Sequence, residues 1–279
     1  MNDHRPGITL TCRDGRTEGG AAVPDGRTGD HLSRAGASAW ARYRRLADEY
    51  RQQRILLRLV LAGSAAVVAL GLAGRQAALG AAVLTALAHA LHCRYRPGPG
   101  SATDWRRGAL AERRTGRRLA RLGRGHRVLH DRALPELPGT NLDHLVIGRT
   151  GVHAVIDRHW RPGTRLWADR YRIWAGRRPI TALSATVAQI ADTVAELLSA
   201  ELGEEIPVSP IVAVHGARLP RGGLEHRGVV FQRSSRLPRF IRECPHIFTG
   251  AEVAAITAAA ERMFPSMLDV LSHRARSLS

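Results

Sequence analysis

The sequence predicts an α/β domain that follows a helical hairpin of membrane-spanning length. Two nearly uninterrupted apolar runs, 55–73 and 77–93, predict the hairpin. From residue 108 onward, short apolar or alternating runs are interspersed with longer segments of helical periodicity, which predicts a central mixed sheet flanked by helices. A chain of 279 residues with 44% hydrophobic residues is long and apolar enough for such a domain to bury a core.

The two apolar runs have the properties of transmembrane helices. Each would rise by about 25 to 29 Å, roughly one hydrocarbon thickness. Arginines flank both outer ends of the pair, whereas the far turn carries only Arg75. The positive-inside rule therefore predicts a multi-pass cell-membrane protein with both termini in the cytoplasm. The alternative is a buried helical hairpin in a soluble core, which is disfavoured because no polar stripe interrupts either run.

The remaining divisions of the chain follow from composition. The first 36 residues have few large apolar side chains and no periodicity, so we expect them to be disordered. Trp40, Tyr43 and Tyr50 recur at helical spacing among arginines, which predicts a basic amphipathic helix. The expected parts are a disordered segment (1–36), that helix (37–54), a transmembrane hairpin (55–93), a basic linker (94–107), an α/β domain (108–265) and a C-terminal tail (266–279).

The charge balance is strongly basic, and all of the basic residues are of one type. The formal net charge is +18, from 42 Lys and Arg against 24 Asp and Glu, and every one of the 42 is Arg. The absence of Lys excludes Schiff-base chemistry, a Walker-type phosphate lysine and a nuclease mechanism in which Lys holds the attacking water. Cys12, Cys93 and Cys244 are far apart and odd in number, so no disulfide framework is indicated and a reducing compartment is expected.

The segment 94–132 holds twelve arginines against Asp104, Glu112 and Asp131. Such a segment can be a juxtamembrane collar attracted to anionic lipid. It can equally be a surface that contacts nucleic-acid phosphates. Composition does not separate these interpretations.

The α/β part is expected to begin with a helix and three strands, and to continue with further helices and strands. The turn at 148–151 joins the second and third strands. We expect helices at 108–122, 182–202, 237–242 and 252–264, and strands at 127–131, 142–148, 152–160, 210–215 and 229–232, with one or two more around 166–174.

Acidic residues on neighbouring elements suggest a metal site. In the third strand, Asp157 and His159 point to one face, and the tight turn brings Asp143 of the preceding strand to within one residue of register with Asp157. Two carboxylates can hold a hard cation such as Mg²⁺. Glu112 would supply a third if the first helix packs on the sheet. The alternative for each acid taken alone is a solvated surface group.

The stretches "AERRTGRRLARL", "RVLHDRALPELPGTNLDHLVIGRTGVHAVIDRHW" and "SPIVAVHG" resemble the nuclease-related domain (NERD) family, whose fold is similar to the PD-(D/E)xK nucleases. The resemblance covers roughly residues 109–242 and implies a restriction-endonuclease-like α/β core. It also implies metal-dependent hydrolysis of phosphodiester bonds with Mg²⁺ or Mn²⁺. Glu112, Asp143 and Asp157 are then the metal-binding acids.

One departure from the family pattern affects the expected chemistry. His159 stands where the family has Lys, which would position water and stabilise developing charge. Beside carboxylates, a protonated His159 could act as an electrophile or general acid, or it could ligate a transition metal. The family often has Gln on the next helix, and the corresponding residue here is Gln189.

Two other groups of residues have simpler interpretations. His144 is expected to be a packed or hydrogen-bonding histidine. Trp160, Trp167 and Trp174 recur every seven residues and could stack on bases, although such tryptophans more often pack an edge of the sheet.

Three functions therefore remain open. The first is a membrane-anchored, metal-dependent nuclease that acts on DNA or RNA at the cytoplasmic face. The second is a weakened or inactive module, tethered to the membrane, that binds nucleic acid or acts as a scaffold. In the third, the arginine-rich collar binds lipid alone and the folded domain binds protein.

Overall fold

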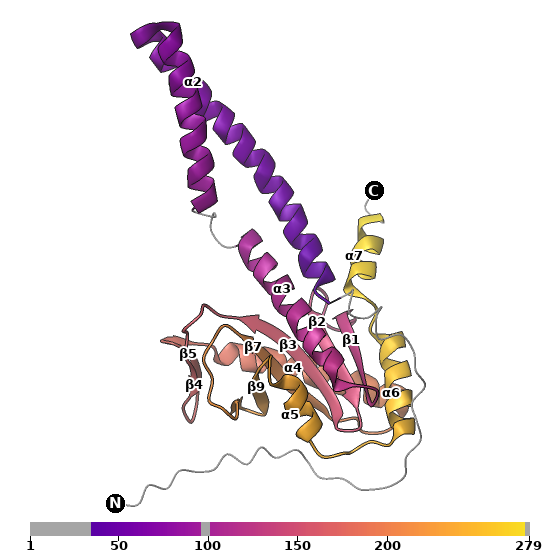
Figure 1. Ribbon diagram of the computed structural model, residues 1–279. Coiled ribbons are helices and arrows are strands. Elements are labelled where there is room, and N and C mark those ends of the chain that lie inside the picture. The colour runs from indigo at the N-terminus through magenta and orange to yellow at the C-terminus, as the bar shows by residue number, and fades with distance from the viewer. Residues whose placement is uncertain (1–34, 96–100, 277–279) are drawn as a thin grey trace, which may run out of the picture. The chain divides into compact units, whose positions relative to one another are not determined.

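The computed structural model describes residues 35–95 and 101–276 (Figure 1). The chain divides into two compact units: Ser38–Arg107 forms one, and Gly108–Ser279 forms the other together with the residues before Ser38. The segment expected to be disordered, 1–36, lies outside the described residues except for Ala35 and Gly36.

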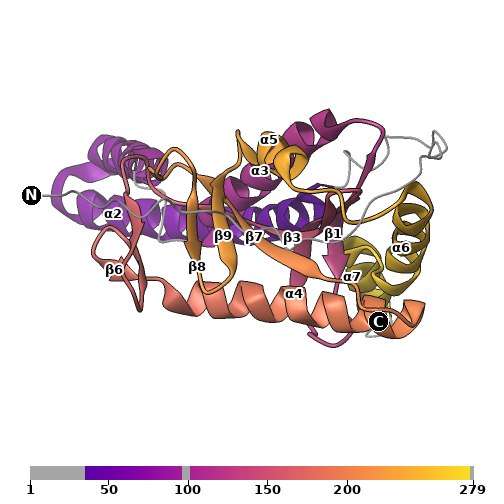
Figure 2. The same ribbon diagram turned by 90° about the horizontal axis from the view of Figure 1, so that it is seen from below.

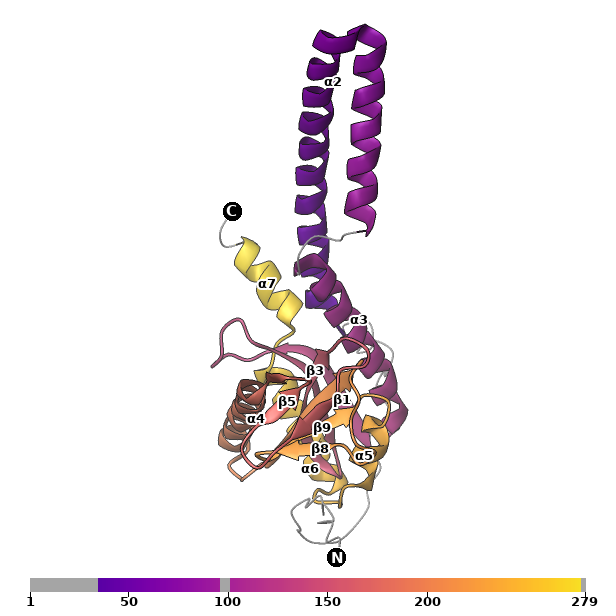
Figure 3. The same ribbon diagram turned by 90° about the vertical axis from the view of Figure 1, so that its left-hand side faces the viewer.

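The first unit consists mainly of the long helix α2, Ala37–Tyr95. The helix runs without interruption across the expected boundary between the amphipathic and apolar segments. It breaks at Gly74, whose φ of 80° and ψ of −173° are readily adopted only by glycine. The two arms on either side of Gly74 are antiparallel (Figures 1 and 3). One helix within α2 is long and apolar enough to cross a membrane, which is a statement of length and composition alone.

The α/β unit contains the remaining elements. In chain order they are α3 (Ser101–Leu119, which begins in the first unit), η1 (Ala120–Leu122), β1 (His126–Ala133), β2 (Asn141–Gly148), β3 (Gly151–His159), β4 (Leu166–Ala168), β5 (Ile173–Ala175), β6 (Arg178–Pro179), α4 (Thr181–Leu202), β7 (Val208–His215), β8 (Leu224–His226), β9 (Val229–Arg233), α5 (Leu237–Glu243), α6 (Gly250–Met263) and α7 (Met267–Arg276).

The main sheet has six strands in the order β1-β2-β3-β7-β9-β8. Strands β3, β7 and β9 pair in parallel, whereas the β1–β2, β2–β3 and β8–β9 pairs are antiparallel. The predicted central mixed sheet is therefore confirmed. Because β3 and β7 are parallel, their carboxyl ends lie at the same edge of the sheet.

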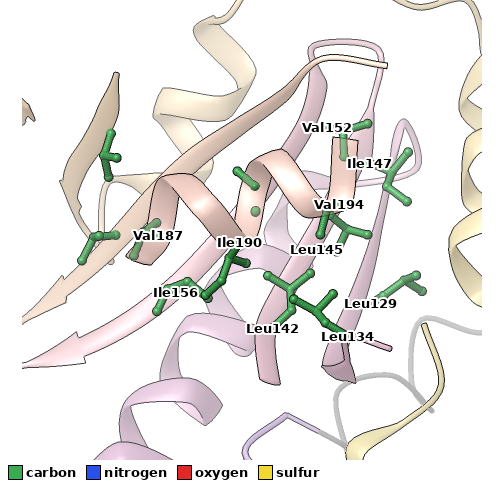
Figure 4. Packing of buried hydrophobic residues seen from close by; sticks show 14 of the residues in the cluster. Leu129, Leu134, Leu142, Leu145, Ile147, Val152, Ile156, Val187, Ile190 and Val194 are labelled. Atoms are coloured by element: carbon green, nitrogen blue, oxygen red, sulfur yellow. The ribbon is translucent and has the colours of Figure 1, made fainter. Parts of the chain in front are cut away.

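Helices cover both faces of this sheet (Figure 2). On one face, α4 packs Val187, Ile190 and Val194 onto Leu145 and Ile156 (Figure 4). The opposite face lies under α3, η1 and α5, with a second apolar cluster comprising Leu119, Leu122, Val146, Val155, Ile211, Ala213, Leu237 and Ile241. Side chains alternate along β3, so Asp157 lies on the same face as Val155, the face that α3 covers.

A second, three-stranded sheet has the order β4-β5-β6. Its inner face carries Leu166 and Ile173, which are buried in the main core. It is connected to the main sheet through the segment that follows β7, where the Leu166 amide donates to the Arg218 carbonyl at 2.9 Å. The strands expected around Asp169 are thus the β4–β5 hairpin.

Three elements are not among the expected ones, the two-residue strand β6, strand β8 and helix α7. Strand β8 has only three residues and pairs with β9, so it depends on a tertiary partner rather than on its own pattern. Helix α7 lies within 266–279, which was expected to be a tail, and is short enough to depend on contacts with the domain.

Candidate functional site

Asp157, near the end of β3, has polar neighbours at both carboxylate oxygens and accepts hydrogen bonds at Oδ1. The Thr115 hydroxyl donates to Oδ1 at 2.5 Å, and His215 Nε2 lies 2.7 Å from the same oxygen. His144 Nε2 lies 2.9 Å from Oδ2, a distance typical of an ion pair although the contact is not aligned as a hydrogen bond. Burial alone would raise the pKa of Asp157, but its interactions with His144 and His215 outweigh burial and hold the pKa well below its usual range.

Further polar contacts extend from this carboxylate in both directions. His144 Nδ1 lies 2.7 Å from His130 Nδ1 on β1, and the two rings meet edge to face. His215 Nδ1 lies 3.3 Å from the hydroxyl of Ser234, the residue after β9, and that hydroxyl accepts from Arg118 of α3. We call these seven residues the Asp157 network: Thr115, Arg118, His130, His144, Asp157, His215 and Ser234.

One arrangement of protons is consistent with the contacts of the Asp157 network. His215 donates from Nε2 to an ionised Asp157, and the Nε2 proton of His144 faces the other carboxylate oxygen. The Nδ1 atoms of these two rings then accept, one from His130 and the other from the Ser234 hydroxyl. The network therefore stabilises Asp157 as an anion.

Asp143 lies beside Asp157 but within a different set of contacts. In the β2–β3 register, Asp143 would stand opposite Ile156, one residue from Asp157, as the sequence predicts. Its Oδ2 accepts the Asp157 backbone amide at 2.7 Å. Burial and the neighbouring charge of Asp157 raise the pKa of Asp143 to about 7, against the opposing effects of Arg158 and His144.

Glu112 lies on α3, which packs on the sheet as expected. The side chain is buried, and its Oε2 has no hydrogen-bond partner. Burial, followed by the carboxyl groups of Asp143, Asp157 and Asp131, raises the pKa of Glu112 well above its usual range. The chain crosses closely over this helix at Gly36, where a Cβ would lie 2.8 Å from the Ala109 carbonyl oxygen and 3.3 Å from the Glu112 Cβ.

Asp131 is a fourth buried acid that sequence reasoning did not assign a role. It has a φ of 52°, which is unusual for a residue other than glycine, and it interrupts the β1–β2 register at the position opposite Asp143. Its Oδ1 accepts from the Asn141 side chain at 3.1 Å. The signal that could have identified it was the "HDRALP" stretch.

The geometry of these acids tests whether they form a divalent-cation site. Within residues 35–95 and 101–276, no three His, Cys, Asp or Glu side chains are arranged to hold a metal ion. Two of the three predicted acids each keep a buried oxygen without a hydrogen-bond partner, Oε2 of Glu112 and Oδ2 of Asp157. A metal site formed by Glu112, Asp143 and Asp157 therefore stays a prediction.

The two remaining predicted residues differ in position. His159 is exposed at the end of β3, two residues beyond Asp157 on the same alternation. Gln189 is exposed on α4, the helix that covers the opposite face of the sheet. The structure therefore brings Glu112, Asp143 and Asp157 together, places His159 at the edge of this cluster and leaves Gln189 away from it.

Most of the Asp157 network could not be found from the sequence. Thr115 and His215 are 42 and 58 residues from Asp157 along the chain and meet it only through the sheet order and the packing of α3. His215 ends the stretch "SPIVAVHG", which was the one available signal. His144 is a hydrogen-bonding histidine, as expected, and it also contacts Asp157.

Residues 107–215 match the family model described as nuclease-related domain (NERD). This part of the chain is similar to the nuclease-related domain. The match begins in α3 and ends on His215, so the nuclease-related domain includes the four acids and all of the Asp157 network except Ser234. No curated protein and no solved structure matches the chain significantly.

Proposed function

We propose that this chain binds nucleic acid through its nuclease-related domain, at the cytoplasmic face of a membrane, without Mg²⁺-dependent cleavage by Glu112, Asp143 and Asp157. The observation that carries the proposal is that Asp157 already interacts with protein groups at both oxygens, with Thr115 and His215 at Oδ1 and with His144 2.9 Å from Oδ2. A cation at Asp157 would compete with these neighbours.

The family and the charge support nucleic acid as the partner. A nuclease-related domain suggests nucleic-acid binding. The net charge is +18, and every Lys or Arg position of the sequence is an arginine. Guanidinium groups bind phosphate in a bidentate manner. Phosphate contacts of this kind provide affinity without sequence readout.

The absence of Lys supports binding without turnover. His159 takes the position of the family's Lys, and it lies exposed at the strand end instead of within the acidic cluster. An imidazole there supplies less fixed positive charge than an ammonium group would.

A second candidate function is metal-dependent hydrolysis of DNA or RNA. It is favoured by the buried, unpartnered Oε2 of Glu112 and by the raised pKa values of Glu112 and Asp143, because clustered buried carboxyls lack a balancing positive charge. This function requires a cation to bind between these carboxylates.

We also propose that α2 spans the membrane twice, with 55–73 and 77–93 as the spans and both termini in the cytoplasm. The support is the apolar length of α2, the break at Gly74 and the arginines that flank the arms. The basic linker at 94–107 would then hold the nuclease-related domain next to the lipid surface.

The test uses the full chain in nanodiscs of phosphatidylcholine, which carry no net charge to compete for arginines. Fluorescence anisotropy with labelled single-stranded DNA, duplex DNA and RNA in EDTA measures binding over a salt series. Incubation of end-labelled strands with Mg²⁺ or Mn²⁺ measures cleavage. We expect salt-sensitive binding and no cleavage above that of the Asp157→Asn variant.

Two results would contradict this proposal. Failure of all three nucleic acids to bind at low salt would remove nucleic acid as the partner. The second candidate would be established instead if the parent cleaves, Asp157→Asn does not cleave, and the exposed control Asp269→Asn cleaves as the parent does. If the parent is inactive and His159→Lys cleaves, the result would support the idea that turnover was lost because this chain has no lysine at that position.

A further inference from the structure

We propose that the three-stranded sheet β4–β6 holds a single strand of nucleic acid, with bases stacked on Trp167 and Trp174 and phosphates on surrounding arginines. This inference rests on the proposed function and identifies the surface and the form of the partner. We call residues 165–179 the aromatic ribbon.

The outer face of the aromatic ribbon carries a pair of stacked indole rings. Trp167 and Trp174 are cross-strand partners with ring centroids 5.5 Å apart and an angle of 9° between the planes. Pro179 is the register partner of Trp174 on the third strand. Because Leu166 and Ile173 fill the inner face, this pair is anchored to the core beneath it.

Hydrogen bonds fix both indole rings. Trp167 Nε1 donates to the Gly176 carbonyl at 3.1 Å, and Trp174 Nε1 donates to Asp169 Oδ2 at 2.9 Å. Trp167 is 40% exposed. With its N–H donor used internally and one face stacked on the other indole, each ring offers a partner mainly its remaining π-face, and unpaired bases can stack on such a face.

Asp169 is the one acidic residue of the aromatic ribbon, and its side chain holds the loop between β4 and β5 through hydrogen bonds. Asp169 Oδ1 accepts the backbone amides of Tyr171 and Arg172 at 2.8 and 2.7 Å. The loop thereby presents Tyr171, which is 68% exposed, with the Arg170 guanidinium 5.9 Å from its ring. An aromatic side chain and two arginines lie together at this tip.

The charge of the aromatic ribbon complements a polyanion. It contains five arginines against Asp169, and all five are exposed: Arg165, Arg170, Arg172, Arg177 and Arg178. An anionic membrane surface would also attract these arginines. The exposed large hydrophobic residues of the aromatic ribbon, Trp167 and Tyr171, are aromatic side chains of the kind on which unpaired bases stack.

The aromatic ribbon begins at the sheet edge that carries the acidic cluster. The Trp160 amide, just after β3, donates to the His215 carbonyl at 2.9 Å, and the Arg218 amide donates to Thr164 at 2.7 Å. The carboxyl ends of β3 and β7, with Asp157 and His215, are thus continuous with the start of the aromatic ribbon. A strand bound on the ribbon would lie along the edge where the nuclease-related site is found.

The experiment measures anisotropy with the full chain in phosphatidylcholine nanodiscs, in EDTA, using a labelled single strand of about 20 nucleotides and its duplex. We expect Trp167→Leu to weaken single-strand binding by about ten-fold and Trp167→Tyr to weaken it by less than about two-fold, because tyrosine keeps a stacking face. Duplex binding should change little in both variants.

A charge-matched pair of double variants tests the arginines. Arg170→Gln with Arg172→Gln should lower the salt dependence of single-strand binding by about 1.4 in log–log slope. Arg121→Gln with Arg124→Gln removes the same charge from exposed positions before β1, at the other end of the sheet, and should leave the slope unchanged.

The outcomes separate this inference from the proposed function. If the parent chain binds no nucleic acid, the proposed function fails and the inference fails with it. If the parent binds and both the Trp167→Leu and the Arg170/Arg172 variants bind as tightly as the parent, the aromatic ribbon is not the binding surface although the function stands. Should Trp167→Leu fail to fold, as judged by circular dichroism, the arginine variants decide.

Discussion

Asp157 is the residue on which the buried polar groups of this domain depend. Its carboxylate accepts from Thr115 of α3, interacts with His215 of β7 and lies 2.9 Å from Nε2 of His144 on β2. Buried donors without an acceptor cost free energy, so the carboxylate stabilises the fold as well as defining the candidate site.

The first prediction concerns removal of this acceptor. Asp157→Ala should lower the free energy of unfolding by about 3 kcal/mol, because it leaves buried hydroxyl and imidazole donors without their acceptor. In thermal unfolding of the full chain followed by tryptophan fluorescence, this corresponds to a decrease in melting temperature of about 8 °C. The exposed Asp269→Ala is the control. A shift no larger than the control's would contradict a stabilising role for Asp157.

The second prediction concerns Asp143 and pH. Its pKa of about 7 in the folded state, against an ordinary 3.8, means that the folded state binds more protons than the unfolded state in this range. Its contribution to stability is therefore present at low pH and lost as the pH rises toward 7. Asp143→Asn removes the ionisation and can still accept the Asp157 amide through its carbonyl oxygen.

We compare the free energy of unfolding of Asp143→Asn with that of the parent chain at each pH. The difference, variant minus parent, should be larger at pH 8 than at pH 5.5 by on the order of 2 kcal/mol. Melting temperatures of both chains at the two pH values, in EDTA, provide the measurement. An equal difference at both pH values would show that Asp143 does not titrate in this range.

At the scale of single elements, the turn after β7 sets the position of His215. Gly216 has a φ of 80°, and a Cβ there would lie 2.1 Å from the Trp160 carbonyl oxygen. Only glycine allows this close approach, which accompanies the hydrogen bond between the Trp160 amide and the His215 carbonyl.

The third prediction compares two glycines of similar backbone conformation. Gly163 has a φ of 88° but nothing within 4 Å of its hypothetical Cβ. Gly163→Ala should therefore cost only about 1 kcal/mol from backbone strain, whereas Gly216→Ala should cost clearly more because β7 must move away from Trp160. Melting temperatures give the comparison, and equal losses would mean that the close approach does not stabilise the fold.

The elements that the sequence predicts correctly are those with local signals. The β2–β3 hairpin was predicted to within one residue at each boundary, because alternation and a glycine turn are local signals. Strand β8 and helix α7 were missed because short elements depend on tertiary partners. Within the site, the resemblance located Glu112, Asp143 and Asp157, but the contacts of Asp157 with Thr115 and His215 follow from the crossover that places β7 beside β3.

At the scale of the whole molecule, the apolar helix α2 carries the proposal that the chain acts at a membrane. Arg75 follows directly on the break at Gly74, between the two apolar arms. If both arms span the membrane, Arg75 lies on the face opposite to the nuclease-related domain.

The fourth prediction tests this topology. In a chain without its three native cysteines, Arg75→Cys should react with a membrane-impermeant maleimide added to intact cells. Glu136→Cys, at an exposed position of the α/β unit, should react only after the cells are permeabilised. Reaction of both variants in intact cells, or of neither, would contradict the double-span topology.

The Asp157 network also has a consequence for how the folded domain opens. It joins side chains from four strands, from α3 and from the residue after β9. Some of these side chains contact the Asp157 carboxylate directly and the others contact it through a histidine or a serine; the strands are β1, β2, β3 and β7. Separation of any one of these strands would deprive the others of their partners, so the amide protons of the four strands should exchange with deuterium together, as one cooperative unit. The peripheral helix α7 and the tip of the β4–β5 loop should exchange earlier and independently.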